Sequence, residues 1–425
     1  MSKVKDISLS KAGESELLWA RRNMPVLALI RQRFEKEKPF SGLTIGVALH
    51  LEKKTGILLE TLSAGGAKVL ASSCNPLTTD DRVASALSSK MGVFAWAGQT
   101  DSEYYECLNA VLDSKPDIVI DDGCDLINLL HTTRQSELPK IKGACEETTT
   151  GINRLMAMQK AGKLKFPVFA VNNAYSKFLL DNQFGTAQST LDAIARATNC
   201  LIAGKTVVVA GYGWCGRGIA SRMKGAGANV IVVETAGRLG PHESGMHRAL
   251  SALYDGYRVM SMDEAALQGD IFVTATGNKN VIDSRHFPLM KDGAMLSNSG
   301  HFNSEINEPA LRKASTKVEE IKENVAAYTL SGGKTLYLLS EGRLVNLARP
   351  SGQGHPIEIM DGSFAVQALC CEQLAKSNGM IAGVHDVPMG IDDEVATLLL
   401  ASRGIKLQKP TEEQTAYAES FSEGT

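Results

Sequence analysis

The glycine-rich segment at residues 211–216 constrains the fold of this chain more than any other feature. It reads Gly211-Tyr-Gly213-Trp-Cys-Gly216, follows the apolar run 206–210 and precedes a stretch with helical character. In a dinucleotide-binding βα turn, the first glycine permits the tight turn, the second lets the backbone approach a pyrophosphate, and the third lets the helix pack closely on its strand. The phosphates then lie at the helix N-terminus. The segment therefore predicts a Rossmann-like domain that binds a dinucleotide.

An acidic residue stands where such a domain binds the cofactor ribose. The apolar run 229–233 ends in Glu234, about twenty residues beyond the glycines, which is the usual spacing. A carboxylate there accepts hydrogen bonds from a 2′-hydroxyl and repels a 2′-phosphate, so the sequence favours NAD. Arg238 is able to accept a 2′-phosphate, which keeps NADP as the minority interpretation. A glycine turn without any ligand is the plain structural alternative, and the strand, the helix and the acid together argue against it.

Length and composition restrict the class of protein. A chain of 425 residues exceeds what one hydrophobic core usually serves, so we expect at least two domains. Lys and Arg total 45 against 47 Asp and Glu, a balance that favours a small-molecule partner over nucleic acid or an anionic membrane. The eight cysteines include no CxxC pair, so we expect no metal site. No run approaches the roughly 18 apolar residues of a membrane span, and we expect a cytoplasmic protein.

Strand-like and helix-like stretches alternate through both halves of the chain. Such alternation is typical of α/β proteins with parallel sheets. We therefore predict an α/β fold with two doubly wound Rossmann-like domains, one for substrate and one for NAD, plus a short C-terminal helical tail. We assign 1–183 and 348–388 to a discontinuous substrate-binding domain, 184–347 to the NAD-binding domain and 389–425 to the tail.

Several reactive side chains lie at the ends of predicted strands in the first half. His50 follows one strand, Asp122 follows another, and Lys177 and Asp181 are spaced i, i+4, so on a helix they would share a face. Each has a plain alternative. The Lys177/Asp181 pair could be a solvated ion pair, and Asp122 could form hydrogen bonds within a turn. His50 could cap a loop, and the threonine run 148–150 could be a helix N-cap.

The chain closely resembles the S-adenosylhomocysteine hydrolase family over nearly its whole length, in the pattern of its archaeal or bacterial branch. That resemblance implies a hydrolase of the methyl cycle in one-carbon metabolism with tightly bound NAD, assembled as a homotetramer. Its reaction oxidises the ribose 3′-hydroxyl, eliminates homocysteine, adds water and reduces the ketone again, giving adenosine and L-homocysteine reversibly. The matching strings are Cys74-Asn75, Asp121-Asp122-Gly123, Glu146-Glu-Thr-Thr-Thr-Gly151, Asp181-Asn182, Ile202-Ala-Gly-Lys205, Gly211-Tyr-Gly213, Gly300-His-Phe302 and Glu341-Gly-Arg-Leu-Val-Asn346.

The resemblance also implies a role for individual residues. Lys177 and Asp181 would handle the 3′-hydroxyl proton, the lysine acting as a base near neutral pH because burial or its neighbours perturb it. Asp122 and His50 would serve C4′ and the leaving sulfur or incoming water. Substrate and lysine would further be held or positioned by Glu147, His301, Asn172 and, at a hinge-side gate, His355. The dinucleotide would contact Thr148, Thr149, Thr150, Asn182, Gly211, Gly213, Gly216, Glu234, Asn278 and Asn346.

The chain departs from the family pattern at the base-reading positions and elsewhere. The family's adenine-reading Thr and Glu are replaced by Glu52 and Lys54, and a Gln near the pocket becomes Asp80. Hypoxanthine presents an N1-H donor and a carbonyl acceptor, which suit a carboxylate and the ammonium of Lys53 or Lys54. Hydrolysis of S-inosyl-L-homocysteine to inosine and homocysteine is therefore an alternative. Against it, the lysine could face solvent and the glutamate could simply favour the first helical turn.

Three further departures concern the surroundings of the site. Asn173 stands where the family has Asp before the catalytic lysine, and an insertion at 235–246 follows the ribose acid. The C-terminus lacks the Lys and Tyr tail by which many members reach a neighbouring subunit's cofactor. A non-catalytic NAD-binding regulator is a third interpretation, and the intact Lys177, Asp181 and His50 argue against it.

Overall fold

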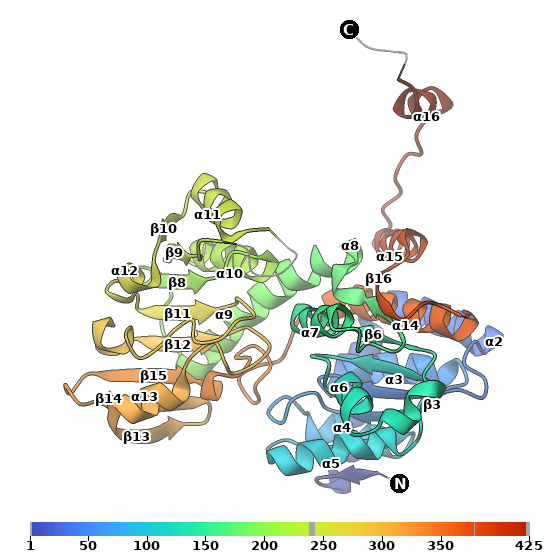
Figure 1. Cartoon of the computed structure of the whole chain (residues 1–425), viewed down its shortest axis with the longest axis horizontal. Helices are drawn as coiled ribbons and strands as arrows, with labels where there is room; N and C mark the ends of the chain where they lie inside the picture. The colour runs from blue at the N-terminus through green and yellow to red at the C-terminus, as the bar shows by residue number, and fades with distance from the viewer. Residues whose placement is uncertain (1, 238–242, 378, 422–425) are drawn as a thin grey trace.

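The computed structural model describes residues 2–237, 243–377 and 379–421, which form two α/β domains side by side (Figure 1). The first domain contains an eight-stranded parallel sheet in the order β1-β4-β3-β2-β5-β6-β7-β16. Its strands are β1 (Lys3–Val4), β2 (Thr44–Ala48), β3 (Lys68–Ser72), β4 (Gly92–Ala95), β5 (Ile118–Asp121), β6 (Gly143–Glu146), β7 (Pro167–Ala170) and β16 (Gly383–Asp386).

Helices cover both faces of this sheet, so its strands are buried on both sides. Parallel strands in that situation read as continuous apolar runs, as 118–120 does. One face packs α1 (Ser10–Arg22), α2 (Pro25–Glu37), α3 (Lys53–Ala64), α4 (Asp81–Ser88) and α14 (Ile357–Lys376). The other packs α5 (Asp101–Leu112), α6 (Asp125–Thr132) and α7 (Thr149–Lys160).

The second domain contains another eight-stranded sheet, in the order β10-β9-β8-β11-β12-β15-β14-β13, in which the last three strands pair antiparallel. Its strands are β8 (Thr206–Ala210), β9 (Asn229–Val233), β10 (Arg258–Met260), β11 (Ile271–Thr274), β12 (Met295–Asn298), β13 (Ser315–Lys322), β14 (Val325–Leu330) and β15 (Thr335–Leu339). Helices α9 (Thr186–Thr198), α10 (Trp214–Gly225) and α11 (Gly245–Tyr254) pack on one face, and α12 (Met262–Ala266) and α13 (Glu308–Ala314) on the other. The predicted fold class is confirmed.

Both sheets reverse their strand order at one point, between β2 and β5 in the first and between β8 and β11 in the second. Ligands of open α/β sheets bind beyond the carboxyl ends of the strands at such a switch point. Here those ends carry the segments that the sequence singled out. His50 follows β2, Asp122 follows β5, and Gly211 follows β8.

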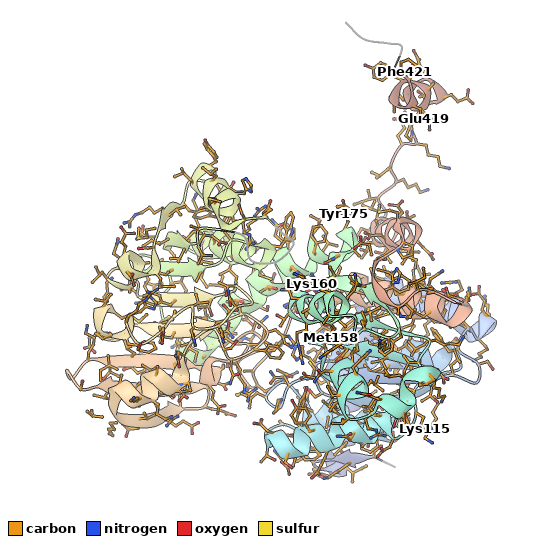
Figure 2. All side chains as sticks on the ribbon, viewed as in Figure 1. Lys115, Met158, Lys160, Tyr175, Glu419 and Phe421 are labelled. Atoms are coloured by element: carbon orange, nitrogen blue, oxygen red, sulfur yellow. The ribbon has the colours of Figure 1, made fainter. Side chains whose placement is uncertain are left out.

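The C-terminal tail begins later than predicted. Helix α15 (Met389–Ala401) packs on α14 and on the short helix α8 (Tyr175–Phe178), so it belongs to the first domain. Asp392 is the reason, because its buried carboxylate accepts the backbone N–H groups of Tyr175 and Ser176 at 2.6 and 2.8 Å. Beyond it the chain is exposed, and α16 (Glu412–Glu419) stands away from the body with Glu419 and Phe421 (Figure 2).

We find no helix in the described ranges whose length and hydrophobicity would suit a bilayer-spanning segment.

Candidate active site

A cavity of about 1580 Å³ lies between the two domains, and both carboxyl edges contribute to its wall. Nearly all residues singled out in the sequence line it. From the first domain and the hinge these are His50, Glu52, Lys54, Asp122, Glu147, Thr148, Thr149, Thr150, Asn172, Lys177, Asp181, Asn182 and His355. From the second domain they are Gly211, Gly213, Glu234, Asn278, His301 and Asn346.

Asp80 does not line the cavity, and the expectation that it reads the substrate is wrong. It caps α4, and two arginines hold its buried carboxylate, Arg82 at 2.8 Å and Arg349 at 3.1 Å. Gly216 is also absent from the wall, but it lies directly beneath the glycine turn. A Cβ on Gly216 would come within 1.9 Å of the Gly211 carbonyl oxygen, which is the close packing expected of the third glycine.

Lys177 lies at the centre of a buried polar cluster. Its Nζ is 2.9 Å from Asp181 Oδ2 and 3.6 Å from Glu147 Oε1, and it donates to Asn182 Oδ1 at 2.8 Å. The lysine is only 5% exposed, so this is not a solvated ion pair. The two residues do not belong to one regular helix. Helix α8 ends at Phe178, Leu179 and Leu180 keep right-handed helical backbone angles, and Asp181 begins a π-helical turn at Asp181–Gly185.

The charge state of Lys177 differs from the expectation. Burial lowers the pKa of its ammonium, but the carboxylates of Asp181 and Glu147 outweigh burial, and the pKa lies above its usual range. The lysine is therefore a cation in this structure and not a base poised near neutral pH. Asp181 shows the matching effect. Burial opposes its ionisation, yet its contacts with His355 Nδ1 and Lys177 hold its pKa below the usual range.

Glu147 is fixed by two side chains that the sequence gave no reason to select. Ser363 donates to its Oε1 at 2.7 Å and Gln367 to its Oε2 at 2.5 Å, both from α14. Burial raises the pKa of Glu147, with Lys177 opposing that effect. The helix that returns to the first domain thus orients a carboxylate at the cavity wall.

Asp122 lies between two histidines from different domains. Its Oδ2 is 3.4 Å from His50 Nε2, and its Oδ1 is 3.6 Å from His301 Nδ1. Burial lowers the pKa of His50 to about 4, so its ring is neutral at physiological pH. Thr78 Oγ1 contacts His50 Nδ1 at 2.8 Å, and the Cys74 thiol lies 3.6 Å from Asp122. Neither residue was selected from the sequence, although Cys74 lies in one of the strings shared with the family.

Two buried carboxylates accept hydrogen bonds from the backbone that carries these residues. Asp121 accepts the N–H groups of Asp122 and Ile127 at 3.0 and 2.9 Å. Glu146 accepts those of Gly123 and Thr148 at 2.8 and 3.0 Å. Burial raises the pKa of Asp121 to about 7. The backbone that presents Asp122 and the threonine run is thereby held in place.

Glu52 and Lys54 form a buried pair at the cavity wall. Lys54 Nζ lies 2.9 Å from Glu52 Oε2 and donates to the Gln353 carbonyl at 2.9 Å. The lysine is 3% exposed, so it does not face solvent. The glutamate also caps α3, accepting the N–H of Lys54 at 3.2 Å through Oε1. Its Oε2 is buried and faces the Lys54 ammonium. Lys53 points elsewhere and pairs with Glu16 at 2.9 Å.

The edge of the second domain is built to hold a dinucleotide. Gly211 has φ +94°, and a Cβ there would meet the Ala275 carbonyl oxygen at 2.7 Å, whereas Gly213 has open space around its Cα at the N-terminus of α10. Glu234 accepts the N–H of Tyr212 at 2.6 Å and lies 3.6 Å from Arg248. These features fit the pyrophosphate and ribose of NAD. Arg238, the candidate for a 2′-phosphate, lies outside the described residues.

An amide oxygen at the same edge has no hydrogen-bond partner among the residues that the structure describes. Asn346 donates to Ser189 Oγ at 3.1 Å, but its buried Oδ1 accepts no hydrogen bond. Such an acceptor at the cavity wall suits a ligand that brings its own donor.

Comparison with known proteins agrees with this geometry. A family model described as S-adenosyl-L-homocysteine hydrolase matches residues 1–140, and the NAD-binding domain model of the same family matches residues 182–352. This chain belongs to the S-adenosyl-L-homocysteine hydrolase family. The match to the NAD-binding model confirms NAD as the cofactor, and the chain is a hydrolase of that family.

Full-length relatives of the family carry two different names. The chain is 55% identical over 427 residues to S-inosyl-L-homocysteine hydrolase of Methanocaldococcus jannaschii, covering all of both chains. It is 53% identical to the enzyme of the same name from Methanococcus maripaludis, again over all of both chains. It is 51% identical over 424 residues to adenosylhomocysteinase of Thermococcus kodakarensis, covering 99% of this chain and 98% of the relative.

Proposed function

We propose that this chain hydrolyses S-adenosyl-L-homocysteine reversibly to adenosine and L-homocysteine, as a cytoplasmic homotetramer in the methyl cycle. The observation that carries the proposal is the meeting of two proton-transfer groups in one cavity beside the dinucleotide cradle. One group is Lys177 with Asp181 and Glu147, and the other is Asp122 between two histidines. A simple dehydrogenase requires one such group next to its cofactor, whereas an oxidation coupled to an elimination requires both.

Bound NAD would accept the hydride from the ribose C3′ and later return it. A ketone at C3′ acidifies the neighbouring C4′ hydrogen, so homocysteine leaves C5′ by β-elimination and water adds to the resulting enone. In this chain, Lys177 and Asp181 would hold and move the proton at O3′. Because the lysine is a cation with a carboxylate 2.9 Å away, we assign it the hydrogen bond to O3′, and because the low pKa of Asp181 makes that carboxylate a weak base, the two residues would move the proton together.

Asp122 and His50 would work on the other side of the ribose, at C4′ and at the leaving sulfur or incoming water. A neutral imidazole accepts a proton, and an imidazolium gives it back, so the low pKa of His50 prepares it to act first as an acceptor. Glu147, fixed by Ser363 and Gln367, would bind a ribose hydroxyl. His301 would position Asp122 from the second domain.

The second candidate substrate is S-inosyl-L-homocysteine, and the buried pair of Glu52 and Lys54 offers the acceptor and the donor that its base requires. Adenine presents an acceptor at N1 and a donor at its amino group, whereas hypoxanthine presents a donor at N1 and an acceptor at O6. The pair matches hypoxanthine if Glu52 faces N1, and adenine if Lys54 faces N1. Glu52 Oε2, which faces Lys54 Nζ at 2.9 Å, is an acceptor that the donor of either base could also reach. Relatives with both names lie at similar identity.

Comparison of the two thioethers as substrates tests the proposal. Free thiol release is measured for each, and kcat/KM is compared under the same conditions. Release of homocysteine together with adenosine supports the first candidate substrate. A preference of tenfold or more for the inosyl thioether would instead identify S-inosyl-L-homocysteine as the substrate and inosine as the product. If neither thioether releases thiol, the proposed hydrolysis is wrong.

Substitution of the base-reading pair sharpens this test. Lys54→Met and Glu52→Gln each remove a charged hydrogen-bonding partner, and we expect kcat/KM for the preferred thioether to fall about tenfold or more. Lys53→Met is the matched control, because Lys53 is the neighbouring lysine and pairs with Glu16 away from the cavity. An unchanged preference in all three variants would remove the pair from base recognition.

A further inference from the structure

We propose that His50, Cys74 and Asp122 form a binding site for a thiophilic divalent cation such as Zn²⁺, and that its occupancy inhibits the enzyme. The three side chains bring one imidazole nitrogen, one thiol sulfur and one carboxylate oxygen within 4.8 Å of one another. They are separated by 24 and 48 residues along the chain, which is why no sequence spacing indicated a metal. The strand ends of the first sheet bring them together.

The distances suit a tetrahedral ion. Zinc bonds of about 2.0–2.3 Å place neighbouring ligand atoms roughly 3.3–3.6 Å apart. Cys74 Sγ lies 3.6 Å from Asp122 Oδ2, and His50 Nε2 lies 3.4 Å from the same oxygen. Cys74 Sγ lies 3.3 Å from His50 Nδ1, so coordination of one ion by this sulfur and by Nε2 requires the side chains to adjust. Metal binding would displace the thiol proton to solvent, so that sulfur coordinates as a thiolate.

The surroundings orient the ligands and leave a free coordination position. Thr78 Oγ1 contacts His50 Nδ1 at 2.8 Å, the type of hydrogen bond that fixes the tautomer of a metal-binding histidine and leaves Nε2 as the ligand. His50 and Asp122 line the cavity, where a water or His301, 3.6 Å from the other oxygen of Asp122, can complete the coordination. Three protein ligands with one open position are typical of accessible zinc sites.

The ligand set also selects the metal. Sulfur and imidazole ligands favour zinc and its neighbours among the transition metals, whereas Mg²⁺ and Ca²⁺ require oxygen ligands. An ion bound here would occupy His50 and Asp122, which the proposed function assigns to C4′ and the sulfur. The inhibition therefore rests on the proposed function, but the binding does not.

Cobalt(II) is a suitable probe, because a thiolate ligand gives it a charge-transfer absorbance. The metal-free holoenzyme is titrated with Co²⁺, with and without adenosine. We expect one equivalent to produce the thiolate-to-cobalt band, Zn²⁺ to remove it, and adenosine to weaken Co²⁺ binding. Mg²⁺ should not compete.

Two serine variants separate this site from other cysteines. Cys74→Ser should abolish the band and weaken Zn²⁺ binding by at least about tenfold. Cys200→Ser, at a half-buried cysteine beyond α9, should behave as the wild type. A band that survives in Cys74→Ser, or stoichiometric titration of the wild type without a band, would overturn the proposal. If Zn²⁺ binds through Cys74 but thiol release from the thioether is unaffected, the site stands and only the inhibition fails.

Discussion

The two carboxyl edges that face each other across the cavity differ in their chemistry. The edge of the first sheet presents titratable side chains in close contact, with Lys177, Asp181 and Glu147 on one side and Asp122 and His50 on the other. The edge of the second sheet presents the backbone of the glycine turn and the amides of Asn278 and Asn346, with charged side chains such as Glu234, Arg248 and Lys279 around them. Glu234 accepts a backbone N–H and lies 3.6 Å from Arg248. The difference indicates that one domain performs the proton transfers and the other holds the cofactor.

Electrostatics follow the same division. At the first edge, burial and neighbouring charges move the pKa values of several groups, raising those of Lys177 and Glu147 and lowering those of His50 and Asp181. Clusters of perturbed groups are typical of sites that transfer protons. At the second edge, conformation is the main determinant, as the positive φ of Gly211 shows.

Replacing Lys177 should have the largest effect on kcat. It should also distinguish the function of the first edge from that of the second. Lys177→Met removes the cation at the centre of the cluster, and we expect kcat to fall by about 10²–10⁴, the usual contribution of general acid–base catalysis. NAD should stay bound, because the glycine turn and Glu234 lie in the other domain. Thiol release and NAD content are measured on the same preparation. Lys163→Met, at an exposed lysine, is the control. Loss of NAD together with activity would contradict the division.

Replacing Glu234 tests the other edge. Glu234→Gln keeps the shape of the side chain but removes the charge that favours the ribose hydroxyls, so we expect NAD affinity to fall about 10–100-fold, as for hydrogen bonds to charged groups. At saturating NAD, kcat should stay within about twofold. Calorimetric titration of the cofactor-free enzyme provides the affinity. A variant with normal affinity but low kcat would place the glutamate among the proton-transfer groups. Glu308→Gln, in α13, serves as the control.

Asp392 links the first edge to helix α15, which the sequence analysis assigned to the C-terminal tail. Its carboxylate holds the start of α8, the helix that carries Lys177. Asp392→Asn leaves one N–H of α8 without an acceptor and loosens the segment that carries Lys177. Loss of such a cap costs about 1 kcal/mol, so kcat should fall by about fivefold to tenfold while KM changes less. Asp393→Asn changes the exposed neighbour and should have no effect. Equal effects of both variants would show that the contact with α8 does not position the lysine.

His50 gives the smallest predicted effect, on stability. Its pKa is about 4 in the folded protein against 6.5 in an unfolded chain, so between these values only the unfolded state binds the proton. Stability contributed by this residue is complete above pH 6.5 and is lost as pH falls towards 4. His50→Gln should therefore lose less stability than the wild type over that range in urea unfolding. Parallel curves for the two proteins would show that the histidine titrates normally.

The backbone features of the site could be predicted from the sequence, because they depend on local residue types. The glycine turn and the acid that follows β9 need only their own strand and helix to be recognised. His50 and Asp122 were also accessible, since each directly follows a strand. The pairing of Lys177 with Asp181 follows from their i, i+4 spacing, although α8 ends at Phe178 and Asp181 begins a π-helical turn that the sequence did not indicate.

The remaining features depend on residues far apart in the chain. Ser363 and Gln367 reach Glu147 from more than 200 positions away, and no local pattern marks them. Asp80 was misassigned because its carboxylate pairs with Arg349, which is also more than 200 positions away in the chain, and with Arg82. The sign of the pKa shift of Lys177 depends on summing burial against two carboxylates, which requires their positions.

The central claim is that the NAD held by the second domain is reduced and reoxidised within each turnover, while the first domain performs the proton transfers. Rapid mixing of NAD-loaded enzyme with the preferred thioether, while nicotinamide absorbance and free thiol are both followed, tests it directly. We predict a transient rise of the reduced-nicotinamide absorbance that decays as homocysteine accumulates over many turnovers, with no net reduction at the end. Thiol release without any such transient, or reduced nicotinamide accumulating in proportion to product, would contradict the account.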